Sequence, residues 1–280
     1  MGLVHRGRIT PLSSFIPLLY KDREVGLEVD YSKSMQQIFK EAASAVITQE
    51  QSLDILLAGC GLLRSDGLPS WVPDWRREAS DKRATPFTSR KRFMTRYKGS
   101  SWKEDIVIVG HEYKAFGDSK VVFSFSGDLG ILHVSCKIID TIAMVDKVHV
   151  NETSEVVLGS ATKLVESSRE FVGNAKGVGI LGVLIAGKDG SFVENYTDEV
   201  IQNVMNGRRF IITKSGHLGV GPGSIQKGHI VCVIAGCNFP IVLCAEGDHY
   251  LLVGEAFVRN MTSGEALGND FWPWQEIKIH

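Results

Sequence analysis

The feature that most constrains the fold is a series of short apolar segments between Arg208 and Leu267, separated by glycine, proline, asparagine or aspartate. The segments are rich in valine, isoleucine and leucine. Turn residues recur between them roughly every eight to twelve residues, which is typical of a β barrel or sandwich. We therefore expect strands over residues 208–213, 218–222, 228–234, 239–243 and 250–258.

Helical patterns lie outside this β-rich segment. Between Met35 and Ile47, apolar residues recur at intervals of three and four, which predicts an amphipathic α-helix. Ser34 and Gln37 are placed to form a capping box at its start, because the hydroxyl and the amide can each satisfy a backbone N–H group. Shorter helices are expected over residues 52–58, 157–172 and 198–206.

Together these patterns predict an α+β fold, with a small β barrel or sandwich at the C-terminus and packed helices from the N-terminal half. Residues 1–98 are expected to form a helical segment with a tryptophan-rich loop and a basic loop. Residues 99–280 are expected to form a β-rich domain with inserted helices, and the two parts to make one compact unit. Further strands are expected over residues 106–110, 121–126 and 131–136, with strand or extended chain continuing to residue 148.

The β-rich segment contains motifs in a defined order: RRFIIT at 208–213, GHLGVGP at 216–222, GHIVCVIAG at 228–236, PIVL at 240–243 and VGEAFV at 253–258. A separate motif, LPSWVPDW, lies at 68–75. In this combination the chain resembles the C-terminal region of fungal heterokaryon-incompatibility (HET) proteins. The resemblance implies the accessory half of such a protein. It also implies that the N-terminal HET domain, an effector domain similar to Toll/interleukin-receptor domains, is missing, because only a short segment precedes the matching residues.

The LPSWVPDW motif limits what its two tryptophans can do. Pro69 and Pro73 exclude a regular helix or a central strand, so Trp71 and Trp75 lie on a stiff, irregular loop. Each indole buries on the order of 200 Å², and the pair must therefore either cover a core or line a binding pocket. Asp74 stands between them, where it either caps the loop or presents a carboxylate beside the two indoles.

One charged residue, Glu255, interrupts the last apolar segment. Strand alternation would place it on the same face as Val253 and Phe257, among apolar neighbours. A buried carboxylate needs a cationic partner, and Arg208 or Arg209 is the candidate for that role. Such a pair can serve either structure or catalysis.

Candidate site residues follow from these arguments and from the resemblance. The binding candidates are Trp71, Trp75 and Arg208. The catalytic candidates are Asp74, Glu255 and Glu265, the last because it lies in the strongest family match. No nucleophile is assigned, because the sequence contains no Gly-x-Ser-x-Gly motif.

Cofactor motifs are weak throughout the chain. Residues 177–182 formally satisfy GxGxxG, but no strand precedes them and no acidic residue follows at the spacing that dinucleotide binding requires. No HxH, HExxH or CxxC pair occurs, and Cys232, Cys237 and Cys244 are spaced more widely than the close pairs common in zinc sites. We therefore expect neither a metal ion nor another cofactor.

Charge gives little indication of a partner. The 31 basic and 32 acidic residues leave a net charge of −1, so the whole chain has no attraction for nucleic acid or anionic membranes. Residues 76–98 carry nine basic and two acidic residues but, apart from Phe93 and Tyr97, lack the interleaved aromatic residues or glycines of single-strand binders. We therefore interpret them as a solvated loop and expect no nucleic-acid partner.

Neither a membrane segment nor a secretory signal is expected. The longest apolar run, residues 178–186, is interrupted by glycines and falls short of the roughly 18 residues that a membrane helix needs. The five cysteines are an odd number in a chain without a secretory signal, which favours buried, reduced thiols and a cytoplasmic location.

Two classes of function remain open. The first is a HET-like accessory module that binds a protein partner or a small hydrophobic ligand. The alternative is a cofactor-independent enzyme of the isomerase, cyclase or pericyclase type in fungal secondary metabolism, since such sites work by positioning and leave no sequence motif. A deep apolar pocket lined by the two indoles and carboxylates would favour the enzyme, whereas a filled core with an exposed apolar patch would favour the binding module.

Overall fold

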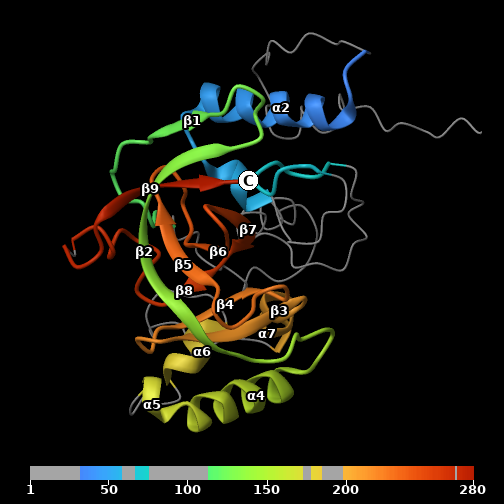
Figure 1. Ribbon diagram of the computed structural model, residues 1–280. Coiled ribbons are helices and arrows are strands. Elements are labelled where there is room, and N and C mark those ends of the chain that lie inside the picture. Colours follow the sequence, from blue (N-terminus) through green and yellow to red (C-terminus); the bar gives the residue numbers. More distant parts are fainter. Residues whose placement is uncertain (1–31, 59–66, 76–112, 173–177, 185–197, 269) are drawn as a thin grey trace, which may run out of the picture.

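The computed structural model describes residues 32–58, 67–75, 113–172, 178–184, 198–268 and 270–280 (Figure 1). This part of the chain combines helices with a nine-stranded sheet, which confirms the α+β prediction. The strands are β1 Phe123–Phe125, β2 Leu132–Val145, β3 Arg208–Thr213, β4 Leu218–Pro222, β5 Ile230–Ile234, β6 Ile241–Glu246, β7 His249–Glu255, β8 Phe257–Val258 and β9 Trp274–Ile279. The helices are α2 Met35–Glu50, the 3-10 helix η2 Asp54–Ala58, α4 Ser154–Ser167, α5 Arg169–Val172, α6 Val178–Leu184 and α7 Asp198–Met205.

The long strand β2 joins the two parts of the sheet. Its first half pairs with β9 on one side, and its middle pairs with β5, with Cys136 opposite Ile234 and Thr141 opposite Ile230. Its last residues pair with β3. Because β2 has 14 residues, it runs along the height of the molecule and can pair first with β9 and then with β3 (Figure 1).

The strand pairings return to their starting point. One circuit runs from β2 through β5, β6, β7 and β9 back to β2, and its β7–β9 step is a single parallel pairing between Tyr250 and Ile279. A second path leads from β2 through β3 and β4 to β8, which follows β7 after Ala256 alone. The first circuit therefore forms a ring, and the second path shares β2 with it and ends at β8.

Most of the expected strands are present, but their bounds differ. Residues 131–136 and the extended chain after them form the single strand β2. Residues 121–126 contribute the short β1, which pairs with β2 in antiparallel orientation. The strand expected over residues 106–110 lies outside the described residues. The strand β9 was not predicted from the sequence; its six residues carry two buried side chains, Ile277 and Ile279.

The predicted helix after Ser34 is confirmed. The Ser34 hydroxyl accepts a hydrogen bond from the backbone N–H of Gln37 (3.2 Å), and α2 buries Phe39, Ala43 and Ile47. The short helix expected next is the 3-10 helix η2. Leu53, just before it, donates its backbone N–H to the carbonyl oxygen of Gly236 (2.8 Å), which fixes this segment to the end of β5.

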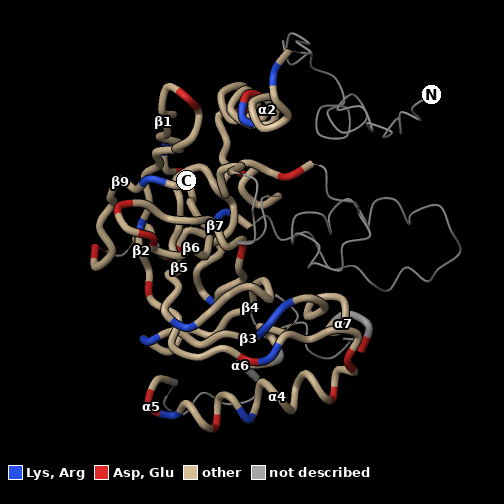
Figure 2. The backbone as a smooth tube through the Cα atoms, turned by 45° about the vertical axis from the view of Figure 1, so that its right-hand side comes forward, with Lys and Arg blue, Asp and Glu red and all other residues tan. Residues whose placement is uncertain are grey.

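The helices after β2 lie at one end of the molecule, where α5, α6 and α7 contact β3 or β4 and α4 packs against these helices (Figures 1 and 2). The helix expected over residues 157–172 is divided into α4 and α5 at Ser168, and α4 begins earlier because Thr153 caps it by accepting from the N–H of Val156. The helix expected over residues 198–206 is confirmed as α7. The glycine run at residues 177–182 lies largely in α6, whose Ile180 is buried.

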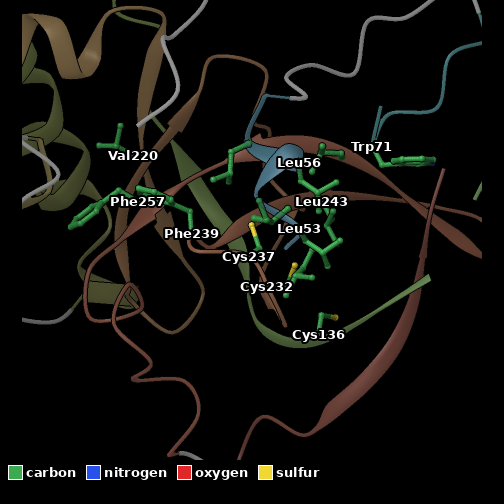
Figure 3. Close-up of a cluster of buried hydrophobic side chains, with 14 of the residues drawn as sticks. Leu53, Leu56, Trp71, Cys136, Val220, Cys232, Cys237, Phe239, Leu243 and Phe257 are labelled. Carbon is green, nitrogen blue, oxygen red and sulfur yellow. The ribbon is translucent and has the colours of Figure 1, made fainter. Parts of the chain in front are cut away.

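Both faces of the central strands are buried. On β5, Cys232 and Ile234 belong to the larger hydrophobic cluster, whereas Val231 and Val233 belong to the smaller one. The larger cluster includes buried residues of α2 and η2. Figure 3 shows Leu53 and Leu56 beside the side chains of the strands. Burial on both faces explains why these strands appear in the sequence as continuous apolar runs and not as alternating ones.

Candidate binding site

The two tryptophans of the LPSWVPDW loop pack into the molecule. Trp71 is fully buried, and its ring lies 5.5 Å from that of Phe125, centroid to centroid. Trp75 is half-buried and meets Phe39 edge-on at 5.1 Å. Of the two alternatives for this loop, the structure favours the core-covering one, because the Trp71 indole has no surface to offer a ligand.

The same loop bridges the narrow β7–β9 junction. The Ser70 backbone N–H donates to the carbonyl oxygen of His280 (2.9 Å), and its hydroxyl also donates to that oxygen. The backbone N–H of Leu252 in β7 donates to the Ser70 hydroxyl oxygen (2.8 Å). Ser70 therefore connects β7 with the end of β9 where the two strands share one pairing.

We expect Ser70→Ala to destabilise the protein by about 1–3 kcal/mol, because it leaves the buried N–H of Leu252 without an acceptor. Urea unfolding followed by circular dichroism would measure this loss. Ser167→Ala is the matched control, since the Ser167 hydroxyl makes an exposed hydrogen bond to its own helix. Equal effects of the two substitutions would contradict the bridging role.

The predicted pairing of Glu255 with Arg208 is confirmed. An Arg208 Nη2 atom lies 3.4 Å from Glu255 Oε1, and both side chains are buried. Arg208 also donates from Nη1 to the carbonyl oxygen of Val204 in α7 (2.9 Å). Arg209, the other candidate, instead donates to the carbonyl oxygen of Ile225 (3.1 Å). The ion pair therefore links β3, β7 and α7 inside the molecule.

The predicted alternation along this segment is wrong in one respect. Val253 belongs to the smaller hydrophobic cluster and Phe257 to the larger one, so they do not share a face. The register between β6 and β7 shifts at this point, and Gly254 has a φ of 143°, a conformation that L-residues rarely adopt. This bulge reverses the faces between Val253 and Phe257.

Aromatic rings and a buried thiol pack in the larger hydrophobic cluster. Tyr113 lies 4.6 Å from Phe239 and 6.3 Å from Phe257, centroid to centroid. Burial raises the pKa of the Cys237 thiol well above its usual value, and the negative charges of Asp54 and Glu255 raise it further. Cys237 is therefore a neutral thiol and a poor nucleophile.

Buried thiols are a general feature of the described strands. Cys136, Cys232 and Cys237 are free and buried, as the sequence analysis expected, whereas Cys244 is half-buried. Burial raises the pKa of Cys232 as well, with a further contribution from the neighbouring Cys136. Figure 3 shows the three buried sulfur atoms within the hydrophobic cluster.

The remaining catalytic candidates lie elsewhere. Asp74 is half-buried beside Trp75. Glu265 is exposed on the segment between β8 and β9, where its carboxylate accepts the backbone N–H of Ser263 (2.5 Å). Glu255, by contrast, is buried in the ring. The structure thus gives Glu265 a local turn contact and shows no hydrogen bond or ion pair that joins it to Glu255 among the described residues.

An aromatic surface segment was missed by the sequence analysis. We call residues 271–274, Phe-Trp-Pro-Trp, the aromatic segment. Phe271 is 82% exposed and Trp274 is 40% exposed, although Lys137 Nζ lies 5.5 Å from the Trp274 ring centroid. Trp272 is half-buried and packs on the smaller hydrophobic cluster. The sequence signal that could have identified this segment is the presence of three aromatic residues within four positions.

The described residues contain neither a metal-ligand cluster nor a membrane-spanning helix. Among the residues that the structure describes, no group of three or more His, Cys, Asp or Glu side chains is arranged to hold a metal ion. Within the same ranges, every helix is too short or too polar to cross a bilayer.

Comparison with known proteins identifies the β-rich part of the chain. Residues 183–270, which include α7 and β3 to β8, match the Het-6 β-barrel domain. A segment of 65 residues is 42% identical to heterokaryon incompatibility protein 6, OR allele, of Neurospora crassa. This match covers 22% of the chain and only 10% of that relative. No solved structure matches the chain. Residues 183–270 are thus similar to the Het-6 β-barrel domain, and a short segment of the chain is similar to a fungal heterokaryon-incompatibility protein.

Proposed function

We propose that this chain is a HET-type accessory module that binds a protein partner through the aromatic segment. The observation that supports this most directly is the exposure of Phe271 and Trp274, the two aromatic residues among the exposed large hydrophobic side chains of the described residues. Aromatic side chains are enriched at protein interfaces, where a few of them provide most of the binding energy.

The burial of Trp71 supports a binding module over an enzyme. An isomerase or cyclase of the kind considered above would need an apolar pocket lined by both indoles and a carboxylate, and Trp71 is fully buried. Glu255 is engaged with Arg208. By relation to the Neurospora protein, whose name refers to heterokaryon incompatibility, we place the module in the recognition step of such a response.

The test compares the wild type with the double variant Phe271→Ser/Trp274→Ser. Partners would be captured from fungal extract by crosslinking, identified by mass spectrometry, and purified for direct titration. We expect the double variant to bind a genuine partner at least about 30-fold more weakly, as loss of an interface hot spot of about 2 kcal/mol implies. The control is Val156→Ser, which removes an exposed apolar side chain from α4.

Two outcomes would contradict this assignment. One is a purified partner that binds the wild type and the double variant equally. The other is a small hydrophobic molecule that raises the melting temperature of both proteins by the same amount in a thermal-shift screen, since a ligand stabilises the folded state in which it binds. That second result would assign recognition to the interior around Arg208 and the neighbouring aromatic rings.

A further inference from the structure

A histidine between two carboxylates lies at the end of β2, outside the candidate binding site. The His149 side chain is 1% exposed. Its Nε2 atom lies 3.0 Å from Asp146 Oδ2, and its Nδ1 atom lies 2.5 Å from Glu152 Oε2. A neutral imidazole has one donor nitrogen, whereas an imidazolium donates from both. Both contacts are therefore hydrogen bonds only when His149 is protonated.

Other groups fix the two carboxylates. Asp146 Oδ1 accepts from the Ser160 hydroxyl of α4 (2.7 Å) and from the backbone N–H of Lys147 (2.8 Å). Lys147 Nζ pairs with Glu152 Oε1 at 2.5 Å. From β3, the positive charge of Arg209 also faces Asp146. Two cations besides His149 thus favour the ionised carboxylates.

The backbone of the same segment is fastened to the start of β3. The N–H of His149 donates to the carbonyl oxygen of Arg208 (2.9 Å), and the N–H of Gly207 donates to the carbonyl oxygen of His149 (2.8 Å). The N–H of Asn151 donates to the side chain of Asn206 (3.2 Å). Backbone hydrogen bonds therefore hold the connection between β2 and α4 against the junction between α7 and β3.

The electrostatic balance favours the charged cluster. Burial alone would lower the pKa of His149, but its hydrogen bonds to Asp146 and Glu152 outweigh burial and raise it above the ordinary 6.5. Burial opposes ionisation of Asp146, yet hydrogen bonds from His149 and Ser160 lower its pKa below 3.8. Hydrogen bonds from Lys147 and His149 lower the pKa of Glu152 below 4.5.

These shifts define the pH window. A raised histidine pKa contributes stability that is fully present below pH 6.5 and is lost as the pH rises through the folded-state value. Lowered carboxyl pKa values contribute stability that is present above pH 4.5 and is lost as the pH falls through the folded-state values. The cluster is therefore strongest between about pH 4.5 and 6.5.

We propose that residues 146–152 form a proton-operated latch, in which the His149 imidazolium holds the β2–α4 connection on the α7–β3 junction and its deprotonation releases that connection. Above the transition, one ring nitrogen presents a lone pair to a carboxylate oxygen in a buried site. The Arg208 carbonyl oxygen accepts the hydrogen bond from the His149 N–H, and the Arg208 side chain pairs with Glu255. Release of the β2–α4 connection therefore starts next to the buried ion pair.

The test is hydrogen exchange on the full chain between pH 5.5 and 8.5, expressed as protection factors that correct for the pH dependence of chemical exchange. For the amides of His149 and Gly207, we expect protection to fall about tenfold across the transition, the factor that corresponds to loss of about 1.4 kcal/mol from a charge-assisted hydrogen bond. His133→Gln is the control, because His133 pairs with the exposed Glu276.

Two variants separate a latch from a passive contact. In Glu152→Gln the amide can donate to a neutral His149, so protection at these amides should stay high and lose its pH dependence. In His149→Gln the protection of these amides should no longer depend on pH, and it should be lower than in the wild type at low pH. Unchanged pH dependence in Glu152→Gln, or a His149 ring signal that titrates at or below pH 6.5 by NMR, would overturn the proposal. The Glu152 variant retains Asp146 and His149, so loss of folding does not obscure the result.

Discussion

Glu255→Ala is expected to destabilise the protein by about 3–5 kcal/mol, because removing one member of a buried ion pair leaves the other charge in a medium that solvates it poorly. Glu255 is 2% exposed and Arg208 is 1% exposed, so water cannot replace the lost carboxylate without opening the ring. Urea unfolding followed by far-UV circular dichroism would measure the change in the free energy of unfolding.

Two further variants make this prediction specific. Glu246→Ala removes an exposed carboxylate from β6 and should change the free energy of unfolding by no more than about 0.5 kcal/mol. Arg208→Met/Glu255→Leu replaces the whole pair with apolar side chains and should recover most of the loss, as replaced buried pairs do elsewhere. A double variant as unstable as Glu255→Ala would mean that the pair is not the source of the effect.

The parts of the fold that were predicted depend on local signals. The Ser34 cap and the spacing of apolar residues were sufficient for α2, because both act within one or two turns. The glycine turns at Gly216 and Gly247 were sufficient for the hairpins β3–β4 and β6–β7, since both glycines have positive φ. In each case the residues that determine the element are part of it.

The parts that were not predicted depend on distant partners. The strand β9 has exposed residues along its first half, and it is a strand because β2 pairs with it over Leu132–Lys137. The bulge at Gly254 arises where β7 leaves β6 to become β8 beside β4. Neither the pairing of β9 nor the bulge changes the spacing of apolar residues within its own segment. The spacing therefore did not predict β9, and it predicted the wrong face for Val253.

The candidate site was predicted in part for the same reason. Glu255 stood out as a charge in an apolar run, and a nearby arginine was its natural partner. The Asp146–His149–Glu152 cluster was missed, because its residues lie in a loop where a spacing of three implies no shared face. The aromatic segment was missed because it lies beyond Leu267, where the family motifs end.

The family match and the structure have different boundaries. Residues 183–270 contain β3 to β8, but β2 and β9 lie outside them. In the structure β2 pairs with both β3 and β5, and β9 pairs with β2 and β7. The matched region therefore depends for its strand pairing on two strands beyond its ends and on Ser70 from the LPSWVPDW loop. These contacts give the loop a structural role.

Trp71→Ala is the second substitution for which we expect a large effect, a loss of about 3–5 kcal/mol, because it empties a fully buried site against Phe125. Within the described part of the chain, the indole N–H of Trp71 has no hydrogen-bond partner. Packing is then its main contribution, and Trp71→Phe should cost less than Trp71→Ala because it retains a ring. The midpoint of urea unfolding by circular dichroism, with an unchanged slope, would measure this loss.

The comparison with the other tryptophans tests the cause. Trp75→Ala should cost less than Trp71→Ala because Trp75 is half-buried, and Trp274→Ala should cost about 0.5 kcal/mol or less because its ring is 40% exposed. If Trp71 instead lined a ligand site, Trp71→Ala would leave stability nearly unchanged and impair binding. Measuring both stability and binding thus distinguishes a core tryptophan from a tryptophan that contacts a partner. Of Trp71, Trp75 and Trp274, only Trp274 is expected to affect binding and not stability.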